Sequence, residues 1–533
     1  MRSGRTIVPA LLLLAAGVAA AAAPAPAAPA PAGEEIQLDV VRHRLPNGLV
    51  LLVVERHTAP VVSAYLRFAV GSANEHAGVI GAAHFVEHML FKGTTTIGTR
   101  DRPREAELMA AEDRAFDRLR PLRRQAARLA TRGEAVPDSL AARIGELEAE
   151  AARLGAALAE LVLSEEIDRI YQRNGAVELN ASTGYDATQY FVSLPANRLE
   201  LWARITADQM ENPVFREFFA ERDVVMEERR LRVDNQPDLK LDEQVIGTAY
   251  LANPYQIMWE WLSEVENISR PELVEFFRRH YSPNRAVIAL VGDVRAADAI
   301  ALVERYFGAI PAQPEPEPVV VEEPEQKGER RLVVEFDAEP EVTIAWHKTA
   351  SGQPDDAVFA VIGEVLARGR TSRFYRRLVE GTQVAQDVSA DQYPGSGLLG
   401  SADPGLFMVR GAPRAPHTAA ELEGAILDEV AGLGREPVSA EELERVKTNL
   451  EADLIRGLRS NLGLAGALAD HEGLGGDWRG LLRAPVRVRA VTAADVMRVA
   501  RRYLVPSNQT VGWLERPAAA DSGGSDSGGG AGR

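Results

Sequence analysis

The sequence predicts an α+β fold made of two similar units, each with a sheet packed against helices, and two observations support this. RRHYSPNRAVIALVGD (278–293) is echoed by ARRYLVPSNQTVGWLE (500–515), and the segment 211–228 is echoed at 435–452. In addition, β-rich runs such as GLVLLVVER and VVSAYLRFAVG stand ahead of helix-like stretches. An internal echo of this length indicates a duplicated structural unit.

The order of segments along the chain follows from composition. Arg2 and Arg5 precede an apolar run that ends in small residues, which is typical of a cleaved signal peptide. We therefore expect an exported protein, periplasmic or secreted, with membrane attachment only if that segment stays uncleaved. The predicted divisions are a signal peptide (1–23), an Ala/Pro spacer (24–36), a first unit (37–312), a Pro/Glu-rich linker (313–327), a second unit (328–517) and a disordered tail (518–533).

One stretch of the first unit, residues 103–163, differs from the rest. Apolar residues recur there at alternating spacings of four and three, on both sides of the turn-like TRGEAVPDS. This pattern predicts a helical hairpin, an antiparallel coiled coil inserted into the first unit, with Pro121 bending its first arm. We expect such a hairpin, held by its own seam, to be separable from the main core.

Composition excludes several functions. The 533-residue chain carries a formal net charge of -17, so a nucleic-acid partner, which needs clustered Lys and Arg, is not expected. It contains no cysteine, which excludes disulfides and thiolate metal sites. Any metal must therefore be bound by histidine and carboxylate side chains.

The most informative motif is HFVEHMLFKGT. His84 and His88 stand four residues apart and so share one face of a helix, with Glu87 beside them. Burying these groups among apolar neighbours is costly unless something neutralises them, and a divalent metal does so. Two histidines and a carboxylate are a known zinc ligand set, and Glu87 is left free to accept a proton from water. Without other context, the two histidines could equally be ordinary satisfied helix residues.

A third ligand has to come from another segment. In FFAERDVVMEERR, Glu221 and Glu228 lie seven residues apart, on one face of a helix, whereas Glu227 points elsewhere. This spacing favours Glu228 as a ligand with Glu221 supporting it. Taken alone, the segment could also be a solvated charged face.

HFVEHMLFKGT, NASTGYDATQYF and ERDVVMEE occur in the order seen in the pitrilysin/insulinase family of inverted-zinc-motif metalloendopeptidases, which this chain resembles along nearly its whole length. The resemblance implies one Zn²⁺ per chain, bound by His84, His88 and Glu228. It also implies Glu87 as the general base and Glu221 as a supporting carboxylate. In such enzymes the peptide substrate adds as a strand beside the metal, which here points to Asn180 and Ala181.

The second unit departs from this family's pattern. Active members carry an Arg and a Tyr seven residues apart that contact substrate, but those positions here are Val379 and Gln386. Relatives that divide the metal and the Arg/Tyr pair between two chains suggest that this chain is the metal-bearing member of a heterodimer, with a homologous partner chain. Nearby Tyr375, Arg376 and Arg377 are expected to be structural.

Two other functions remain open. One is a non-catalytic structural or assembly subunit, and the other is a coiled-coil binding protein on a peptidase scaffold. The complete set His84, Glu87, His88 and Glu228 favours a zinc endopeptidase that cleaves peptides or unfolded segments.

Overall fold

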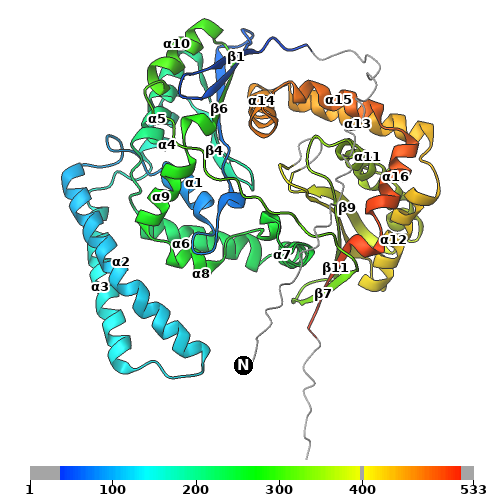
Figure 1. The fold of residues 1–533 in the computed structure, drawn as a ribbon, viewed down its shortest axis with the longest axis horizontal. Coiled ribbons are helices and arrows are strands. Elements are labelled where there is room, and N and C mark those ends of the chain that lie inside the picture. Colours follow the sequence, from blue (N-terminus) through cyan, green and yellow to red (C-terminus); the bar gives the residue numbers. More distant parts are fainter. Residues whose placement is uncertain (1–36, 396–400, 518–533) are drawn as a thin grey trace, which may run out of the picture.

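The computed structural model describes residues 37–395 and 401–517, so the predicted signal peptide, spacer and tail lie outside the described residues. Figure 1 shows two α/β halves side by side, each with its own mixed sheet. The α+β prediction is confirmed. In the described ranges, no helix is long and apolar enough to span a membrane.

The first sheet has six strands. Their spatial order is β1 (Val41–Arg44), β2 (Val50–Glu55), β6 (Ala286–Gly292), β3 (Val61–Phe68), β5 (Thr188–Pro195) and β4 (Val177–Thr183). All neighbours are antiparallel except β2 and β6, which are parallel. The edge strand β4 carries Asn180 and Ala181, and the residues GYDA (184–187) connect β4 to β5.

The second sheet repeats this topology with five strands. Their order is β7 (Arg330–Glu335), β11 (Gln509–Glu515), β8 (Glu341–His347), β10 (Leu406–Pro413) and β9 (Ala385–Tyr393). Here β7 and β11 are the parallel pair, and the other pairs are antiparallel. The order β2-β6-β3-β5-β4 therefore matches β7-β11-β8-β10-β9, as expected for a duplicated unit.

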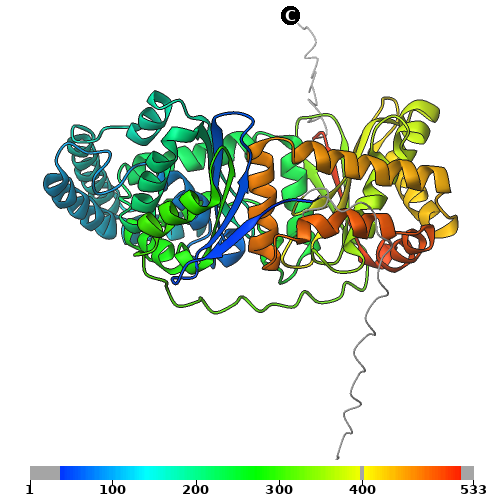
Figure 2. The same cartoon turned by 90° about the horizontal axis from the view of Figure 1, so that it is seen from above.

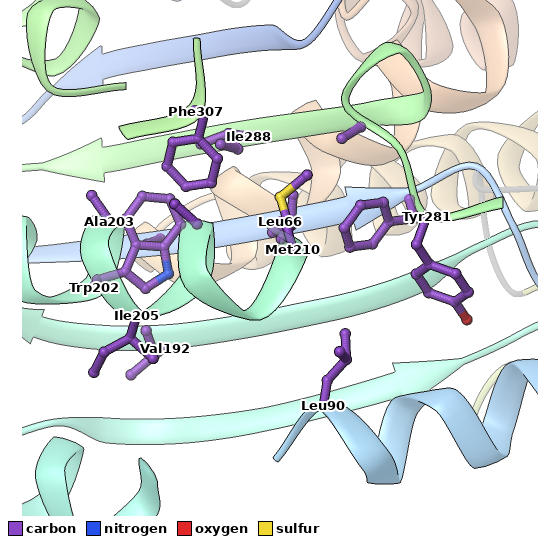
Figure 3. Close-up of a cluster of buried hydrophobic side chains, with 14 of the residues drawn as sticks. Leu66, Leu90, Val192, Trp202, Ala203, Ile205, Met210, Tyr281, Ile288 and Phe307 are labelled. Carbon is purple, nitrogen blue, oxygen red and sulfur yellow. The ribbon is translucent and has the colours of Figure 1, made fainter. Parts of the chain in front are cut away.

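One face of each sheet is covered by helices that belong to the same half of the chain as the sheet. Figure 3 shows part of the first core, where Trp202, Phe307 and Met210 fill the space over β3 and β6. The helices of the first half are α1 (Ala82–Leu90), α4 (Glu166–Arg173), α5 (Leu199–Glu211), α6 (Phe218–Arg229), α8 (Leu262–Asn267), α9 (Arg270–His280) and α10 (Ala296–Phe307). Those of the second half are α11 (Asp356–Ala367), α12 (Ala419–Arg435), α13 (Ala440–Gly457), α15 (Gly480–Ala490) and α16 (Ala493–Tyr503).

The other face of each sheet is covered by a helix from the opposite half. Helix α14 (Asn461–Gly475) places Leu464 and Leu468 against Leu52 and Val287 of the first sheet. Helix α7 (Pro237–Ala249) packs Leu241, with neighbouring apolar residues, on the second sheet. In Figure 1 both helices lie at the junction of the halves. The sequence division at 313–327 therefore does not separate two independent cores.

Helices α2 (Arg102–Thr131) and α3 (Asp138–Ala159) pack side by side at the outer edge of the first half, as Figures 1 and 2 show. Pro121 lies within α2, which continues through it. The base of this pair is attached to the main body through two buried ion pairs. Arg216 Nε lies 2.8 Å from Glu105 Oε1, and Arg270 Nη2 lies 2.5 Å from Glu112 Oε2.

Candidate metal and peptide site

Helix α1 presents two different faces. Phe85, Val86 and Met89 are fully buried in the first core, whereas His84 and His88 are half-buried on the opposite side. The helix begins after Gly81, whose φ is +96° and where a Cβ atom would lie 2.7 Å from the Cβ atom of Glu260. Only glycine fits this left-handed position and this close approach, so Gly81 lets α1 begin directly against the segment that holds Glu260.

The sequence-predicted ligands lie together. His84 Nε2 and His88 Nε2 are 3.2 Å apart, and Glu228 Oε2 lies 3.8 Å from the first and 3.4 Å from the second. One ligand atom from each residue falls within 4.8 Å of the others. Ligand atoms about 2.0–2.1 Å from a tetrahedral zinc ion are separated by roughly 3.3 Å. Both the donor types and their spacing therefore fit zinc.

A carboxylate holds the far nitrogen of each histidine. His84 Nδ1 lies 3.1 Å from Glu260 Oε1, and His88 Nδ1 lies 2.8 Å from Glu221 Oε1. A hydrogen bond at Nδ1 fixes the tautomer and leaves Nε2 to bind a metal. Glu260 follows no readable motif, so the sequence analysis missed it. Only the fold brings it to α1.

The carboxylates of α6 divide as their spacing predicts. Glu221 and Glu228 both face α1, and Lys92 Nζ also contacts Glu221 at 2.5 Å. Glu227 is mostly exposed and pairs with Arg230 at 3.1 Å. The structure thus brings Glu228 to the two histidines and leaves Glu227 outside.

The electrostatics of this cluster favour a bound cation. Hydrogen bonding to His88, followed by the charges of His84 and Arg232, lowers the pKa of Glu228 to about 2. Burial would lower the pKa of His88, but its bonds to Glu221 and Glu228 raise that pKa to about 9. In the metal-free protein a proton on His88 therefore compensates the carboxylates, and a metal ion would replace that positive charge.

Glu87 lies on the same half-buried face of α1 as the two histidines and is not among the grouped ligand atoms. Its Oε2 accepts a 2.5 Å hydrogen bond from Thr183 Oγ1 at the end of β4. Burial raises the pKa of Glu87, while that hydrogen bond opposes the rise. A carboxylate whose pKa is raised above its usual value binds a proton more readily and can accept and return one. Thr183 is a second residue that the sequence analysis missed.

These groups line one cavity of about 870 Å³. Its wall includes residues 180–185, so the edge strand β4, with Asn180 and Ala181, runs along it beside the histidines. Ala181 N–H donates to Asn180 Oδ1 at 2.9 Å, a side-chain acceptor that a peptide carbonyl could replace. A cavity bordered by a sheet edge suits an extended peptide.

The two positions that correspond to the family's substrate-binding Arg and Tyr lie away from this cavity. Val379 packs against the second core, and Gln386 Nε2 donates to Pro413 O at 3.1 Å. Arg377 pairs with Glu429 at 2.7 Å, and Arg376 lies 3.9 Å from Glu442. None of these four is among the described residues that line the metal cavity.

Comparisons with known proteins show that the chain is similar to peptidases. The family model described as insulinase (peptidase family M16) matches residues 50–119, and the model described as peptidase M16 inactive domain matches residues 267–450. The zinc protease PqqE of Helicobacter pylori is 26% identical over 482 residues, covering 88% of this chain and 91% of that protein.

Solved structures show the same fold. A protease from Helicobacter pylori superposes with a TM-score of 0.72 at 24% identity, covering 90% of this chain and 100% of that chain. The periplasmic protease PqqL from Escherichia coli gives a TM-score of 0.65 at 17% identity, covering 90% of this chain but 48% of that chain.

Proposed function

Because this chain belongs to the insulinase (M16) peptidase family, we propose that it is a zinc-dependent endopeptidase. One Zn²⁺ per chain would be held by His84, His88 and Glu228. The observation that carries this proposal is the convergence of two Nε2 atoms and one carboxylate oxygen in a cavity that also contains Glu87.

The residues of the site divide the chemistry among them. Zinc, when bound, supplies Lewis-acid polarisation of the reacting oxygen atoms. Glu87 takes a proton from the attacking water at its carboxylate and passes it to the leaving amine. Thr183 fixes the Glu87 carboxylate against β4, so the proton acceptor is oriented by the strand that would bind the peptide. Glu221 and Glu260 hold the two imidazole rings.

The substrate is a peptide or an unfolded segment that pairs with the edge of β4. Asn180 and Ala181 would contact its main chain, because they lie on the open edge that borders the cavity. A folded globular protein cannot present an extended strand without local unfolding. We therefore propose that the enzyme acts on flexible polypeptide.

Non-catalytic roles, as an assembly subunit or a coiled-coil binding protein, are the alternatives. They would not need Glu87 to be half-buried and oriented by Thr183 beside a grouped ligand set. This arrangement favours the enzyme.

We further propose that two chains of this kind close around the substrate. The similar Escherichia coli chain is about twice as long as the part that this chain matches, so that molecule has as much chain again beyond the matched part. With Val379 and Gln386 away from the cavity, a homologous partner chain would supply the Arg/Tyr pair. Sedimentation of the purified chain with and without a candidate partner tests this. A fully active monomer would contradict it.

The remaining proposals concern segments. Residues 1–23 would be an export signal, in keeping with the periplasmic relative in Escherichia coli. Residues 103–163 would be an insertion whose helices pack as an antiparallel coiled coil, which the contact of α2 with α3 supports. The peptidase unit would span 37–312, and a metal-free homologous unit would span 328–517.

The direct test replaces Glu87 by Gln. Zinc content, measured by elemental analysis, should remain one per chain, while hydrolysis of an unfolded protein should fall at least about a hundredfold because the proton acceptor is lost. Glu228→Gln should lose zinc, whereas the matched Glu227→Gln on the same helix should keep both zinc and activity. Full activity of Glu87→Gln would overturn the assignment.

A further inference from the structure

The metal cavity is lined by both halves of the chain. Besides the residues of α1, β4 and α6, its wall contains Tyr393 from β9 and Arg410 from β10. The Tyr393 hydroxyl forms a hydrogen bond with the hydroxyl of Tyr185, which lies two residues after the end of β4. Arg410 Nε donates to Asp242 Oδ2 of α7 at 2.6 Å. The second sheet therefore borders the cavity beyond the Tyr185 end of β4.

Of the guanidinium nitrogens of Arg410, only Nε has a short hydrogen bond, which it donates to Asp242. Its partner Asp242 is buried, with 5% of its side chain exposed, and also accepts a hydrogen bond from Thr343 at 3.2 Å. The terminal nitrogens have weaker partners: Nη1 lies 3.5 Å from the mostly exposed Asp391, and Nη2 lies 3.7 Å from the Met408 sulfur. A guanidinium can donate five hydrogen bonds, so Arg410 retains donors for an acceptor that enters the cavity.

Another arginine that joins the two halves is used differently. Arg56 donates from Nη1 to Arg459 O at 3.1 Å and from Nη2 to Leu458 O at 3.0 Å. Both of its terminal nitrogens are therefore engaged with the opposite half. In Arg410, by contrast, the buried Asp242 orients the guanidinium and leaves its end to the cavity.

We propose that Arg410 binds a carboxylate of the peptide substrate and so determines which peptides this enzyme prefers. The inference rests on the proposed peptidase function. The carboxylate belongs either to an acidic side chain on one side of the scissile bond or to the C-terminus of the peptide. A lysine or arginine at the same position would be repelled, because Asp242 already pairs with Arg410 and offers no free charge.

The experiment compares peptides that share one cleavable core. Each position flanking the scissile bond carries Glu, Gln or Lys in turn, and each peptide is made with a free and an amidated C-terminus. Hydrolysis is followed with the zinc-loaded full chain, and equilibrium binding is measured with zinc-loaded Glu87→Gln. At one position, Glu should exceed Gln by about tenfold in both measurements, the size expected for one partly exposed charge-assisted contact. A preference that depends only on the free terminus identifies the C-terminal carboxylate.

Two substitutions change this preference in opposite directions. Arg410→Gln should reduce the preference for a carboxylate to within about twofold, since a neutral amide forms only a weak contact. Asp391→Asn removes the carboxylate that competes for Nη1 and should increase the preference by a few fold. Asp391 is exposed, so this variant should fold even if Arg410→Gln does not. Arg56→Gln, which removes contacts between the halves outside the cavity, should leave the preference unchanged.

The outcomes separate the two proposals. If wild type hydrolyses no peptide but Glu87→Gln binds carboxylate-bearing peptides through Arg410, the peptidase function fails and the binding role of Arg410 stands. If hydrolysis occurs and neither Arg410→Gln nor Asp391→Asn changes the preference, the inference is wrong. An equal loss for Glu, Gln and Lys peptides in Arg410→Gln, together with no change in Asp391→Asn, would assign Arg410 a purely structural role.

Discussion

At the scale of single residues, the orientation of His84 and His88 depends on the carboxylates that contact their Nδ1 atoms. Glu260 and Glu221 each lie within hydrogen-bond distance of one Nδ1 atom, at 3.1 and 2.8 Å. Both Nε2 atoms are thereby turned to one point, and little side-chain entropy remains to be lost when a metal binds. The two outer carboxylates therefore belong to the proposed metal site as much as the proposed ligands do.

Glu260→Gln should weaken zinc binding by about 10–100-fold, because an amide is a poorer acceptor for the imidazole N–H. The zinc dissociation constant is measured by competition with a chelator. Glu266→Gln, in the exposed part of the same segment, is the matched control and should bind zinc as wild type does. Unchanged affinity in Glu260→Gln would mean that α1 alone orients His84.

His471 of α14 gives a second prediction at this scale. Burial, and then the charges of Arg487 and Arg483, lower its pKa to about 4. In the unfolded chain the value is about 6.5, so between these pH values the unfolded state binds the extra proton. The free energy of unfolding should therefore fall as the pH decreases from about 6.5 to 4, by roughly 1 kcal/mol per pH unit.

Chemical denaturation of the metal-free protein checks this, since it removes zinc release from the same pH range. His471→Gln should reduce the slope of the unfolding free energy against pH by that amount. A variant with the wild-type slope would show that His471 is protonated in the folded state.

At the scale of elements, the helix pair α2/α3 has a fixed base and an outer part that makes fewer contacts with the body. The fixed base argues against the expectation that the whole hairpin 103–163 is separable. Glu105 is fully buried against Arg216, and Glu112 is buried against Arg270. Removing these glutamates would leave two buried arginines without their carboxylates, which is far more costly than losing an exposed pair.

Two deletions test the difference. Replacing 125–146 by a short Gly/Ser loop joins the arms next to the Arg123–Glu148 ion pair and should leave zinc content and melting temperature near the wild-type values. Replacing 103–163 should destabilise the protein by at least ~3 kcal/mol, since each unpaired buried charge costs several kcal/mol. Equal stability of the two variants would show that the buried ion pairs at the base contribute nothing.

At the scale of the whole molecule, each half depends on the other for one of its cores. Helix α14 covers the first sheet and α7 covers the second, so each sheet would expose an apolar face without the opposite half. Helix α7 also follows α6 by a short connection, which links Glu228 to the second sheet through the chain. The wall of the metal cavity likewise contains residues of both halves.

Cutting the chain within 313–327, at an introduced protease site, should therefore leave one particle that keeps its zinc. Residues 37–312 expressed alone should aggregate, because the face containing Leu52 and Val287 loses Leu464 and Leu468. Size-exclusion chromatography distinguishes these results. A soluble, zinc-loaded 37–312 fragment would show that the first unit folds independently.

The sequence by itself determined the local features. A spacing of four residues places His84 and His88 on one helix face, and a spacing of seven does the same for Glu221 and Glu228, because the helical repeat fixes which side chains are neighbours. The internal echo likewise predicted two similar α/β units, and the α+β fold is confirmed.

Only the tertiary structure decided what meets these faces. An amphipathic pattern says that a helix buries one side but not against which partner, so the exchange of α7 and α14 was not predictable from periodicity. Glu260, Thr183 and Arg410 reach the cavity through contacts between segments far apart in the chain, which no local spacing encodes. The long-range fold therefore decides which residues surround the candidate site, whereas the local sequence predicts His84, His88 and Glu228 as its metal ligands.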